Sequence, residues 1–342
     1  MPHTEQPLTE RLVRYDDLVP CYNAFIDTRS PGSEAKENFT IIGPGVSENP
    51  QQHVHIAEPH GFNIGGARQP PHCVNSQHSH DTAEVFVVLS GEWSFNIGEK
   101  GDDARILLNP GDVISIPTNV FRGFENVGKD SGFLWAVLGG DDPGRVLWAP
   151  YVFQMASDYG LILLENGSLI DTTRGENIPA HVNPMTPTDA AMVARVQQLD
   201  AAAIRRCVVL SDEFRTLGDG PFSALEGVEE KAVIGPENGK EGIAAGKMGW
   251  PHGFQLRRLT LCPGALIPTH SRAEAEVLFV QQGEAIVQSG DETITMVAGD
   301  TLTIPVGRER SLRSAQGATL FVVHGGDAPQ APVWKDMAAL PA

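Results

Sequence analysis

The chain contains little cysteine and shows no sign of export. Its four cysteines, Cys21, Cys73, Cys207 and Cys262, are scattered and form no Cys-x-x-Cys pair. Disulfide frameworks and cysteine-based zinc modules need clustered thiols, so neither is expected. The N-terminus lacks the basic and then apolar pattern of a secretory signal. These absences favour a cytoplasmic protein with reduced thiols.

Long apolar runs and an excess of positive charge are also missing. No hydrophobic stretch approaches the roughly 20 residues that a membrane-spanning helix needs. The 25 Lys and Arg residues face 43 Asp and Glu residues, which gives a net charge of −18. Such an acidic surface repels nucleic-acid phosphates. There is no Gly-rich phosphate-binding loop ending in Lys-Ser/Thr and no dinucleotide fingerprint. We therefore expect neither a membrane nor a nucleic acid as a partner.

The 342 residues contain an internal repeat. Several residues recur at a spacing of 192 positions, and others recur at 188 positions after a hairpin tip that is shorter in the second copy. The recurring pairs are His78 and His270, Glu84 and Glu276, Gly91 and Gly283, Gly111 and Gly299, Pro117 and Pro305, and Arg122 and Arg310. The repeat predicts two similar domains.

Each copy is typical of an all-β domain. The runs Val85–Leu89 and Val277–Val280 are continuously apolar, as in strands that are covered on both faces. Short runs of this kind alternate with turn signals such as Asn109–Asp112. The sequence therefore predicts two all-β domains, each a sandwich or a barrel.

A helical linker is expected between the two copies. Thr186–Asp189 supplies capping residues, and the apolar spacing continues to Leu199, so we predict a helix over about 187–200. The predicted divisions are an N-terminal extension with strands at 1–60, a first barrel at 61–150, a linker at 151–205 and a second barrel at 206–342.

The residues His78, His80 and Glu84 form the strongest candidate site. Side chains alternate faces along a strand, so all three would point into the first barrel. Two imidazoles and one carboxylate form the facial triad that suits non-haem Fe(II) and leaves positions open for substrate and O₂. We expect one divalent metal per chain, with Fe(II) favoured over Mn, Ni or Zn.

The order and spacing of these residues resemble the two signature motifs of the cupin superfamily. The first motif is His-x-His, three or four residues, Glu, six residues and Gly, and it matches His78, His80, Glu84 and Gly91. The glycine that the motif places six positions before its first histidine is replaced here by His72. The resemblance implies a bicupin, which is two double-stranded β-helix (jelly-roll) barrels in one chain.

The second motif matches in part. Gly111, Pro117 and Asn126 stand at motif positions, whereas Asn119 replaces a glycine and Arg122 replaces the family's fourth metal ligand. A guanidinium has no lone pair to give to a metal. Arg122 would either clamp an anionic substrate beside the metal or pair with Glu84 and remove it as a ligand. We favour metal binding, with Arg122 and Glu84 as candidate catalytic residues.

The second copy has lost this ligand set. His270 and Glu276 remain, but Arg272 replaces the second histidine and Arg310 stands at the fourth position. Two cations would repel a divalent metal. We expect a buried Arg–Glu network rather than an anion pocket, and we expect His324 to be a core histidine.

The resemblance implies an enzyme that acts on a small anionic molecule. Gentisate- and quercetin-type dioxygenases are bicupins of similar build, so a metal-dependent dioxygenase is the favoured reaction. A metal-assisted isomerase, cyclase or decarboxylase is the alternative within enzymes. A non-catalytic bicupin that binds a small ligand remains open, and a storage-type bicupin is disfavoured because such proteins are usually secreted. A homodimer is a further expectation.

Overall fold

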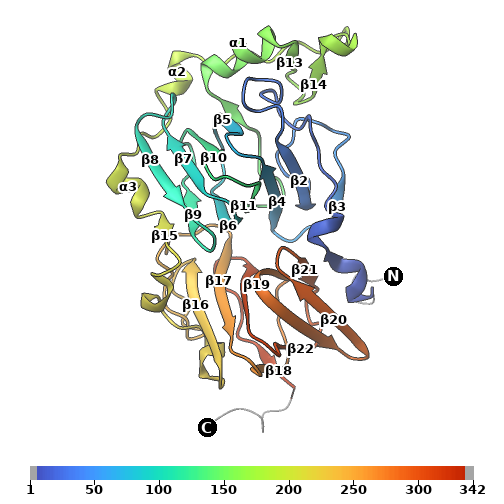
Figure 1. The fold of residues 1–342 in the computed structure, drawn as a ribbon, viewed down its shortest axis with the longest axis vertical. Coiled ribbons are helices and arrows are strands. Elements are labelled where there is room, and N and C mark those ends of the chain that lie inside the picture. Colours follow the sequence, from blue (N-terminus) through green and yellow to red (C-terminus); the bar gives the residue numbers. More distant parts are fainter. Residues whose placement is uncertain (1–5, 336–342) are drawn as a thin grey trace. The chain divides into compact units, whose positions relative to one another are not determined.

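The computed structural model describes residues 6–335 and divides the chain into two compact units. The first unit runs from Val19 to Ser211, and the second combines the segment up to Leu18 with the segment from Asp212 onward. Both are built almost entirely of antiparallel strands (Figure 1). The expected all-β class is therefore confirmed.

The first unit is a barrel made from two sheets. One has the order β12-β5-β10-β7-β8, and the other has the order β15-β9-β6-β11-β4-β2-β3. Its strands are β2 (Glu37–Ile42), β3 (Val54–Ile56), β4 (Phe62–Gln69), β5 (Val74–Ser79), β6 (Glu84–Ser90), β7 (Trp93–Ile97), β8 (Ala104–Leu108), β9 (Val113–Ile116), β10 (Arg122–Asn126), β11 (Gly132–Gly139), β12 (Leu147–Trp148) and β15 (Val208–Val209).

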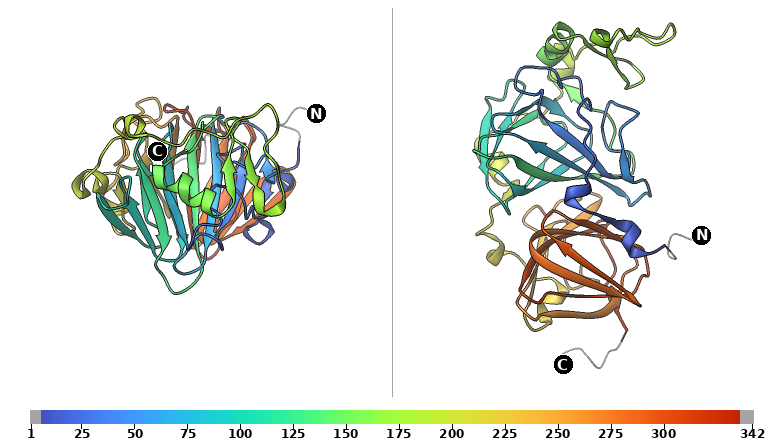
Figure 2. Two further views of the ribbon diagram at one scale, coloured as in Figure 1. Left: turned by 90° about the horizontal axis from the view of Figure 1, so that it is seen from above. Right: turned by 45° about the vertical axis from the view of Figure 1, so that its right-hand side comes forward.

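Short elements lie beside this barrel, and Figure 2 shows α1, β13 and β14 in green outside its strands. They are α1 (Pro150–Asp158), the hairpin β13 (Leu161–Leu163) and β14 (Leu169–Asp171), α2 (Ala190–Val193) and α3 (Ala201–Arg205). Apolar residues of α1 and the hairpin, including Val152, Ala156, Leu161 and Leu163, pack with Trp148 in one buried cluster.

The second unit is a barrel of the same kind. Its main strand order is β16-β17-β23-β19-β22-β18-β24, with β20 and β21 joined to β19 and with β1 joined to β21. Its strands are β1 (Leu12–Val13), β16 (Val228–Ile234), β17 (Phe254–Leu261), β18 (Leu266–Ser271), β19 (Glu276–Ser289), β20 (Glu292–Val297), β21 (Thr301–Ile304), β22 (Arg310–Arg313), β23 (Ala318–Gly325) and β24 (Val333–Trp334).

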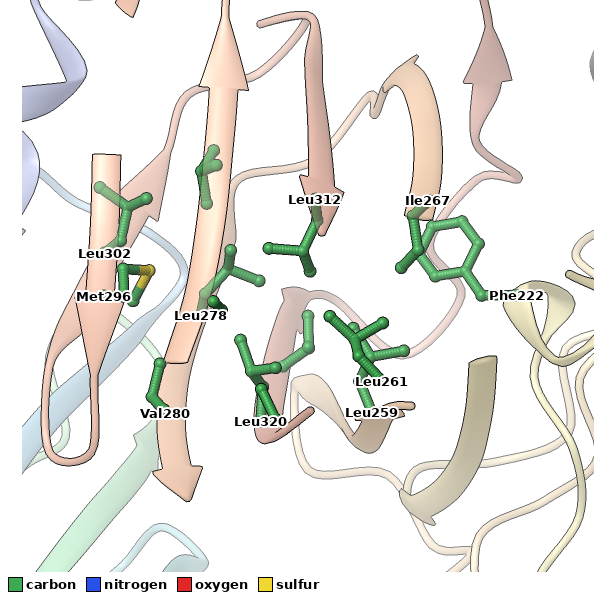
Figure 3. Close-up of a cluster of buried hydrophobic side chains, with 14 of the residues drawn as sticks. Phe222, Leu259, Leu261, Ile267, Leu278, Val280, Met296, Leu302, Leu312 and Leu320 are labelled. Carbon is green, nitrogen blue, oxygen red and sulfur yellow. The ribbon is translucent and has the colours of Figure 1, made fainter. Parts of the chain in front are cut away.

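The interior of the second barrel is filled with aliphatic side chains. Leu259, Leu278, Val280, Leu312 and Leu320 are buried in one cluster (Figure 3). Each lies on a different strand or at positions of equal parity on one strand, because strand side chains alternate between the two faces. Hydrophobic burial of this kind is the main stabilising contribution to such a barrel.

The strand register shows that the two barrels are true repeats. Arg122 pairs with His78 across β10 and β5, and Arg310 pairs with His270 across β22 and β18. In the same way, Glu84 lies opposite Leu138, and Glu276 lies opposite His324. These pairings allow each position of one barrel to be matched with a position of the other.

Two residues that replace glycines of the cupin motifs keep the backbone conformation of those glycines. His72 has φ of 63° and Asn119 has φ of 55°, and the equivalent residues of the second barrel are Gly264 at 83° and Gly307 at 73°. A left-handed conformation suits glycine and costs other residues energy. The turn geometry is therefore retained even though the residue type has changed.

The predicted helix over 187–200 is wrong. The structure has α2 at Ala190–Val193, capped by the Asp189 side chain, and α3 at Ala201–Arg205, capped by Asp200. Between them the Gln197 amide donates to the Asn119 carbonyl at 2.6 Å, and the Gln197 side chain donates to the Thr118 carbonyl. These hydrogen bonds to the barrel replace those that Gln197 would make in a continued helix. The helix α1 was not predicted from the sequence.

The predicted boundaries also need correction. β15 pairs with β9 of the first barrel, so residues 206–211 belong there and the second unit begins at Asp212. The expected linker at 151–205 is part of the first unit. Of the expected extension, residues 6–18 join the second unit through β1, while β2 and β3 complete a sheet of the first barrel. Among the described residues, no helix is both long and apolar enough to span a membrane.

Candidate metal centre

The structure brings His78, His80 and Glu84 together inside the first barrel. His78 lies near the end of β5, His80 follows that strand, and Glu84 begins β6. Each is buried, and one ligand atom from each lies within 4.8 Å of the others. No other group of three such residues was found in the described part of the chain.

Both histidines are held in the form that binds metals. Burial, together with the nearby Arg122 charge, lowers the pKa of His78 and that of His80 well below the usual value. Neutral imidazoles have a lone pair to donate. His78 Nδ1 donates to the Ser76 carbonyl at 2.7 Å, which leaves Nε2 as its ligand atom. His80 Nε2 lies 3.8 Å from Glu84 Oε2.

Arg122 lies beside this group and contacts Glu84. Its Nη2 donates to Glu84 Oε2, and its Nη1 donates to the His78 carbonyl at 3.0 Å. Arg122 is 1% exposed, and it is not among the residues that line the neighbouring cavity. Burial lowers its pKa from the usual value, while Glu84 opposes that shift. Its role as a substrate clamp stays a prediction.

The donor set fits a divalent metal. The Arg122 ion pair uses Oε2 of Glu84, the same oxygen that lies 3.8 Å from His80 Nε2, and it leaves Oε1 of the carboxylate outside the pair as a ligand atom for a metal. Two histidines and one carboxylate form a facial triad, which suits Fe(II) and related ions.

A small cavity adjoins the three candidate ligands. His78, His80 and Glu84 line it together with apolar residues such as Phe86 and Leu138. Its volume is about 80 Å³. Because one water needs roughly 10–15 Å³ on this scale, the cavity has room for several waters or one small molecule.

Small side chains create this cavity. Register places Gly65 opposite Ala136 in the first barrel, and it places Arg257 opposite Val322 at the equivalent positions of the second. Leu138 likewise corresponds to His324. In the second barrel, side chains therefore fill the volume that is open in the first barrel.

The second barrel contains the expected Arg–Glu network. Arg310 Nη2 donates to Glu276 Oε1 at 2.6 Å, and His324 Nε2 contacts Glu276 Oε2 at 2.9 Å. Arg272 Nε lies 3.5 Å from that same oxygen. Both carboxylate oxygens of Glu276 are therefore engaged by side chains of the barrel, and no oxygen is left for a metal.

Sequence reasoning missed the outer part of this network. Glu241 accepts from Arg257 Nη1 at 2.8 Å and from Arg272 Nη1 at 2.5 Å, and Arg257 also reaches Glu230 Oε1 at 3.2 Å. The available signal was the pair of arginines, Arg257 and Arg258, within β17, because one of two adjacent strand residues points to the interior. Burial of the imidazoles lowers the pKa of His270 to about 4 and that of His324 to about 3, as expected for core histidines.

Residues around the first site were missed as well. Trp148 of β12 lies opposite His78, with ring centroids 5.2 Å apart, and Trp334 repeats this arrangement with His270 at 5.4 Å. Asn38 and Thr40 of β2 line the cavity. They precede the recognisable motif, so their place in the barrel could not be derived from its spacing.

Known proteins share this fold. The cupin domain model matches residues 67–137 and 257–324, one match in each barrel. A comparison with curated protein sequences found no significant match.

Solved structures match along nearly the whole chain. Oxalate decarboxylase from Bacillus subtilis matches with a TM-score of 0.56 at 13% identity, covering 99% of this chain and 84% of that one. Oxalate decarboxylase from Lactobacillus farciminis, in a formate complex, gives 0.56 at 12% identity, covering 95% and 88%. Mn(II) centres are described for the Bacillus subtilis protein. With two cupin domains, each folded as its own barrel, the chain is a bicupin.

Proposed function

We propose that the first barrel is the active site of a metal-dependent enzyme that acts on a small anionic molecule. The convergence of His78, His80 and Glu84 on a cavity carries this proposal. Non-haem Fe(II) dioxygenase chemistry is the favoured reaction, because the triad type leaves coordination positions open. The second barrel, whose equivalent positions are filled, is assigned a structural role.

The charge balance of the site favours an anion. The two histidines are neutral, and the charges of Glu84 and Arg122 cancel. A divalent metal would therefore bring a charge of +2 into a buried cavity. An anionic substrate neutralises that charge, whereas a cationic one would be repelled.

The protein residues have separate tasks in this proposal. His78, fixed by its bond to the Ser76 carbonyl, would hold the metal together with His80 and Glu84. A bound Fe(II) supplies open positions for substrate and O₂. Arg122 orients the Glu84 carboxylate, and Phe86, Phe124 and Leu138 exclude water from the cavity.

Metal-dependent decarboxylation is the second candidate. It is favoured by the likeness of nearly the whole chain to oxalate decarboxylases, for one of which Mn(II) centres are described. With a divalent metal bound, the same buried site would carry a positive charge and would bind a carboxylate in either reaction.

Gas measurements on the metal-reconstituted protein separate the two reactions. The full chain is loaded with Fe(II) or Mn(II) and given a panel of small phenolic, diketone and dicarboxylic acids, with O₂ uptake and CO₂ release recorded. O₂ uptake that depends on the metal supports a dioxygenase, and CO₂ release without net O₂ uptake supports a decarboxylase. Metal-loaded protein that gives neither signal with any acid contradicts the proposed enzyme.

A further inference from the structure

We propose that Asn38 is a specificity-determining residue that donates a hydrogen bond to an uncharged oxygen of the substrate. The inference rests on the proposed function and adds the substrate's chemical class: a small carboxylic acid that carries a carbonyl oxygen away from the carboxylate. The carboxylate would lie at the metal, and the carbonyl would lie at Asn38.

Asn38 lies on the wall of the cavity, away from the candidate ligands along the sheet. In the order β6-β11-β4-β2, its strand is three places from the strand that begins with Glu84. Asn38 and Thr40 lie opposite Ala67 and Gly65 of β4, and all four residues line the cavity. A ligand that contacts both Glu84 and Asn38 would therefore span the barrel interior.

The amide nitrogen of Asn38 lacks a partner. Nδ2 is a buried atom with no hydrogen bond, and apart from the candidate metal ligands it is the one such side-chain atom among the described residues that line the cavity. Buried donors are nearly always paired in folded proteins. An unpaired donor on a residue that lines a cavity takes its acceptor from what fills that cavity, which is a water in the empty site and a ligand atom in the occupied one.

The polar neighbours of Asn38 already have partners within the barrel. The Thr40 hydroxyl donates to Gln52 Oε1, and Gln52 Nε2 donates to the Pro44 carbonyl at 2.7 Å. Ser47 Oγ contacts the Ala24 carbonyl at 3.3 Å. The missing acceptor is therefore specific to Asn38 rather than a general feature of a polar wall.

The second barrel shows what such an interior looks like when it is filled. Glu230 lies opposite Leu259 as Asn38 lies opposite Ala67, so these two residues are equivalent. Glu230 Oε1 accepts from Arg257 Nη1 at 3.2 Å, and the residue equivalent to Arg257 is Gly65. In the first barrel, Gly65 has no side chain to contact Asn38, and a cavity lies where the Arg257 side chain lies in the second barrel.

The side-chain path in the second barrel outlines where a ligand would lie in the first. Arg272, which stands at the position of His80, contacts Glu241, and Glu241 contacts Arg257, which reaches Glu230. This path runs from the degenerate metal position to the equivalent of Asn38. A ligand bound at the first metal centre would follow the same route and end at Nδ2 of Asn38.

The group that meets Asn38 is uncharged. Among the described residues that line the cavity there is no lysine or arginine. Lys36, which lies nearby, is already paired with Asp27 and donates to Asn75 Oδ1 at 3.1 Å. A second carboxylate at this wall would be buried without a counter-ion, which is costly. A carbonyl oxygen needs one donor, and Asn38 provides it.

Matched pairs of acids test this assignment. The full chain is loaded with Mn(II) and titrated calorimetrically with acetoacetate and isovalerate, and then with levulinate and isocaproate. Within each pair the two acids differ in that a carbonyl oxygen is replaced by a methyl group. We expect at least one oxo acid to bind wild type roughly three- to tenfold more tightly than its methyl counterpart, which is the effect of one neutral hydrogen bond.

Variants at position 38 should remove this preference. Asn38→Leu should bind both members of the pair equally and bind the methyl acid as wild type does. Asn38→Asp keeps the size of the side chain; it should also lose the preference and bind both acids more weakly, because its charge repels them. Thr40→Val is the matched control on the same strand, and it should keep the preference.

The possible failures are distinguishable. Wild type that takes up no Mn(II) would contradict the proposed function as well as this inference. Wild type that holds Mn(II) but shows no preference in either pair, or binds none of the acids, would overturn the assignment of Asn38 alone. A preference that survives in both Asn38→Leu and Asn38→Asp would overturn it as well.

Discussion

Arg122 and Glu84 form a buried ion pair inside the first barrel, through Nη2 and Oε2. Arg310 and Glu276 form the equivalent pair in the second barrel. The two pairs differ in what surrounds the carboxylate. Glu276 has both oxygens engaged by side chains, whereas Arg122 engages only Oε2 of Glu84, and the Glu84 carboxylate lies close to two neutral histidines. This difference distinguishes the barrel that carries the candidate metal site from the barrel whose interior is filled.

Replacing Arg122 should strengthen metal binding. Arg122→His removes a positive charge and adds an imidazole at the position of the cupin motif's fourth ligand. We expect Mn(II) to bind at least about tenfold more tightly, which corresponds to roughly 1.4 kcal/mol. Arg310→His is the matched control and should bind no metal, because Arg272 and His324 still engage Glu276. Unchanged or weaker affinity in Arg122→His would contradict this account of the ion pair.

Filling the cavity should block ligands without unfolding the protein. Ala136→Val copies Val322 of the second barrel and adds two methyl groups to a residue that lines the cavity. Because the space is open, we expect the free energy of unfolding to change by less than about 1.5 kcal/mol. Binding of isovalerate to the Mn(II) protein should fall at least about tenfold. Undiminished binding, measured calorimetrically, would show that ligands do not use this cavity.

Core histidines of the second barrel should make stability fall in mild acid. The pKa of His270 is lowered to about 4 and that of His324 to about 3, so in the unfolded chain each binds a proton at a higher pH than in the folded chain. Stability therefore rises with pH up to about 6.5 and is lost as pH falls below that value. His324→Leu, which copies Leu138, should reduce the slope by up to about 1.4 kcal/mol per pH unit, measured by urea unfolding between about pH 5 and 6.5. An unchanged slope would contradict a neutral, buried His324.

A buried carboxyl group of the first barrel should have the opposite effect and make stability fall as the pH rises. Burial raises the pKa of Glu48 to about 8, although Trp148 Nε1 and the Ile26 amide both donate to it. In the folded chain Glu48 binds its proton more tightly than in the unfolded chain, so its contribution is present in acid and is lost as pH rises through about 8. Glu48→Gln should therefore flatten the decline in stability from about pH 6.5 to 8, measured by the same urea unfolding. A decline of the same size in the variant would rule out Glu48 as its source.

Glycine at position 72 should stabilise the first barrel. His72 holds φ of 63° with its side chain 80% exposed, and the equivalent residue of the second barrel is Gly264. Relief of left-handed strain should exceed the entropy cost of glycine by about 0.5–1 kcal/mol. Thermal unfolding checks this, with His72→Ala as a control that keeps the strain and should not stabilise. A lower melting temperature for His72→Gly would contradict the role of the strained turn.

The repeat made the fold and the candidate ligands readable from the sequence. The sequence places His78, His80 and Glu84 on one strand, whereas in the structure His78 lies in β5, His80 follows that strand and Glu84 begins β6 of the other sheet. The motif spacing was therefore enough to bring the three together, although alternation along a single strand is not what does so. Contacts between distant segments could not be read in this way. Strand pairing places Asn38 opposite Ala67 and Gly65 opposite Ala136, and no motif records these partners.

The helix prediction failed for a similar reason. The segment after Val193 has helical propensity, but Gln197 gains backbone and side-chain bonds to Asn119 and Thr118 at the barrel. Helix propensity is worth a few tenths of a kcal/mol per residue, and such tertiary contacts outweigh it. The side chain of Asp200 then caps a second short helix.

Metal content is the most direct test of the central claim, which is that the first barrel alone holds a metal. Untagged wild type, His78→Ala and His270→Ala are purified in parallel and examined by elemental analysis, with folding checked by circular dichroism. We predict close to one divalent metal per chain in wild type and in His270→Ala, and almost none in His78→Ala. Folded wild type without metal that also takes up neither Fe(II) nor Mn(II), or equal metal content in wild type and His78→Ala, would contradict the account.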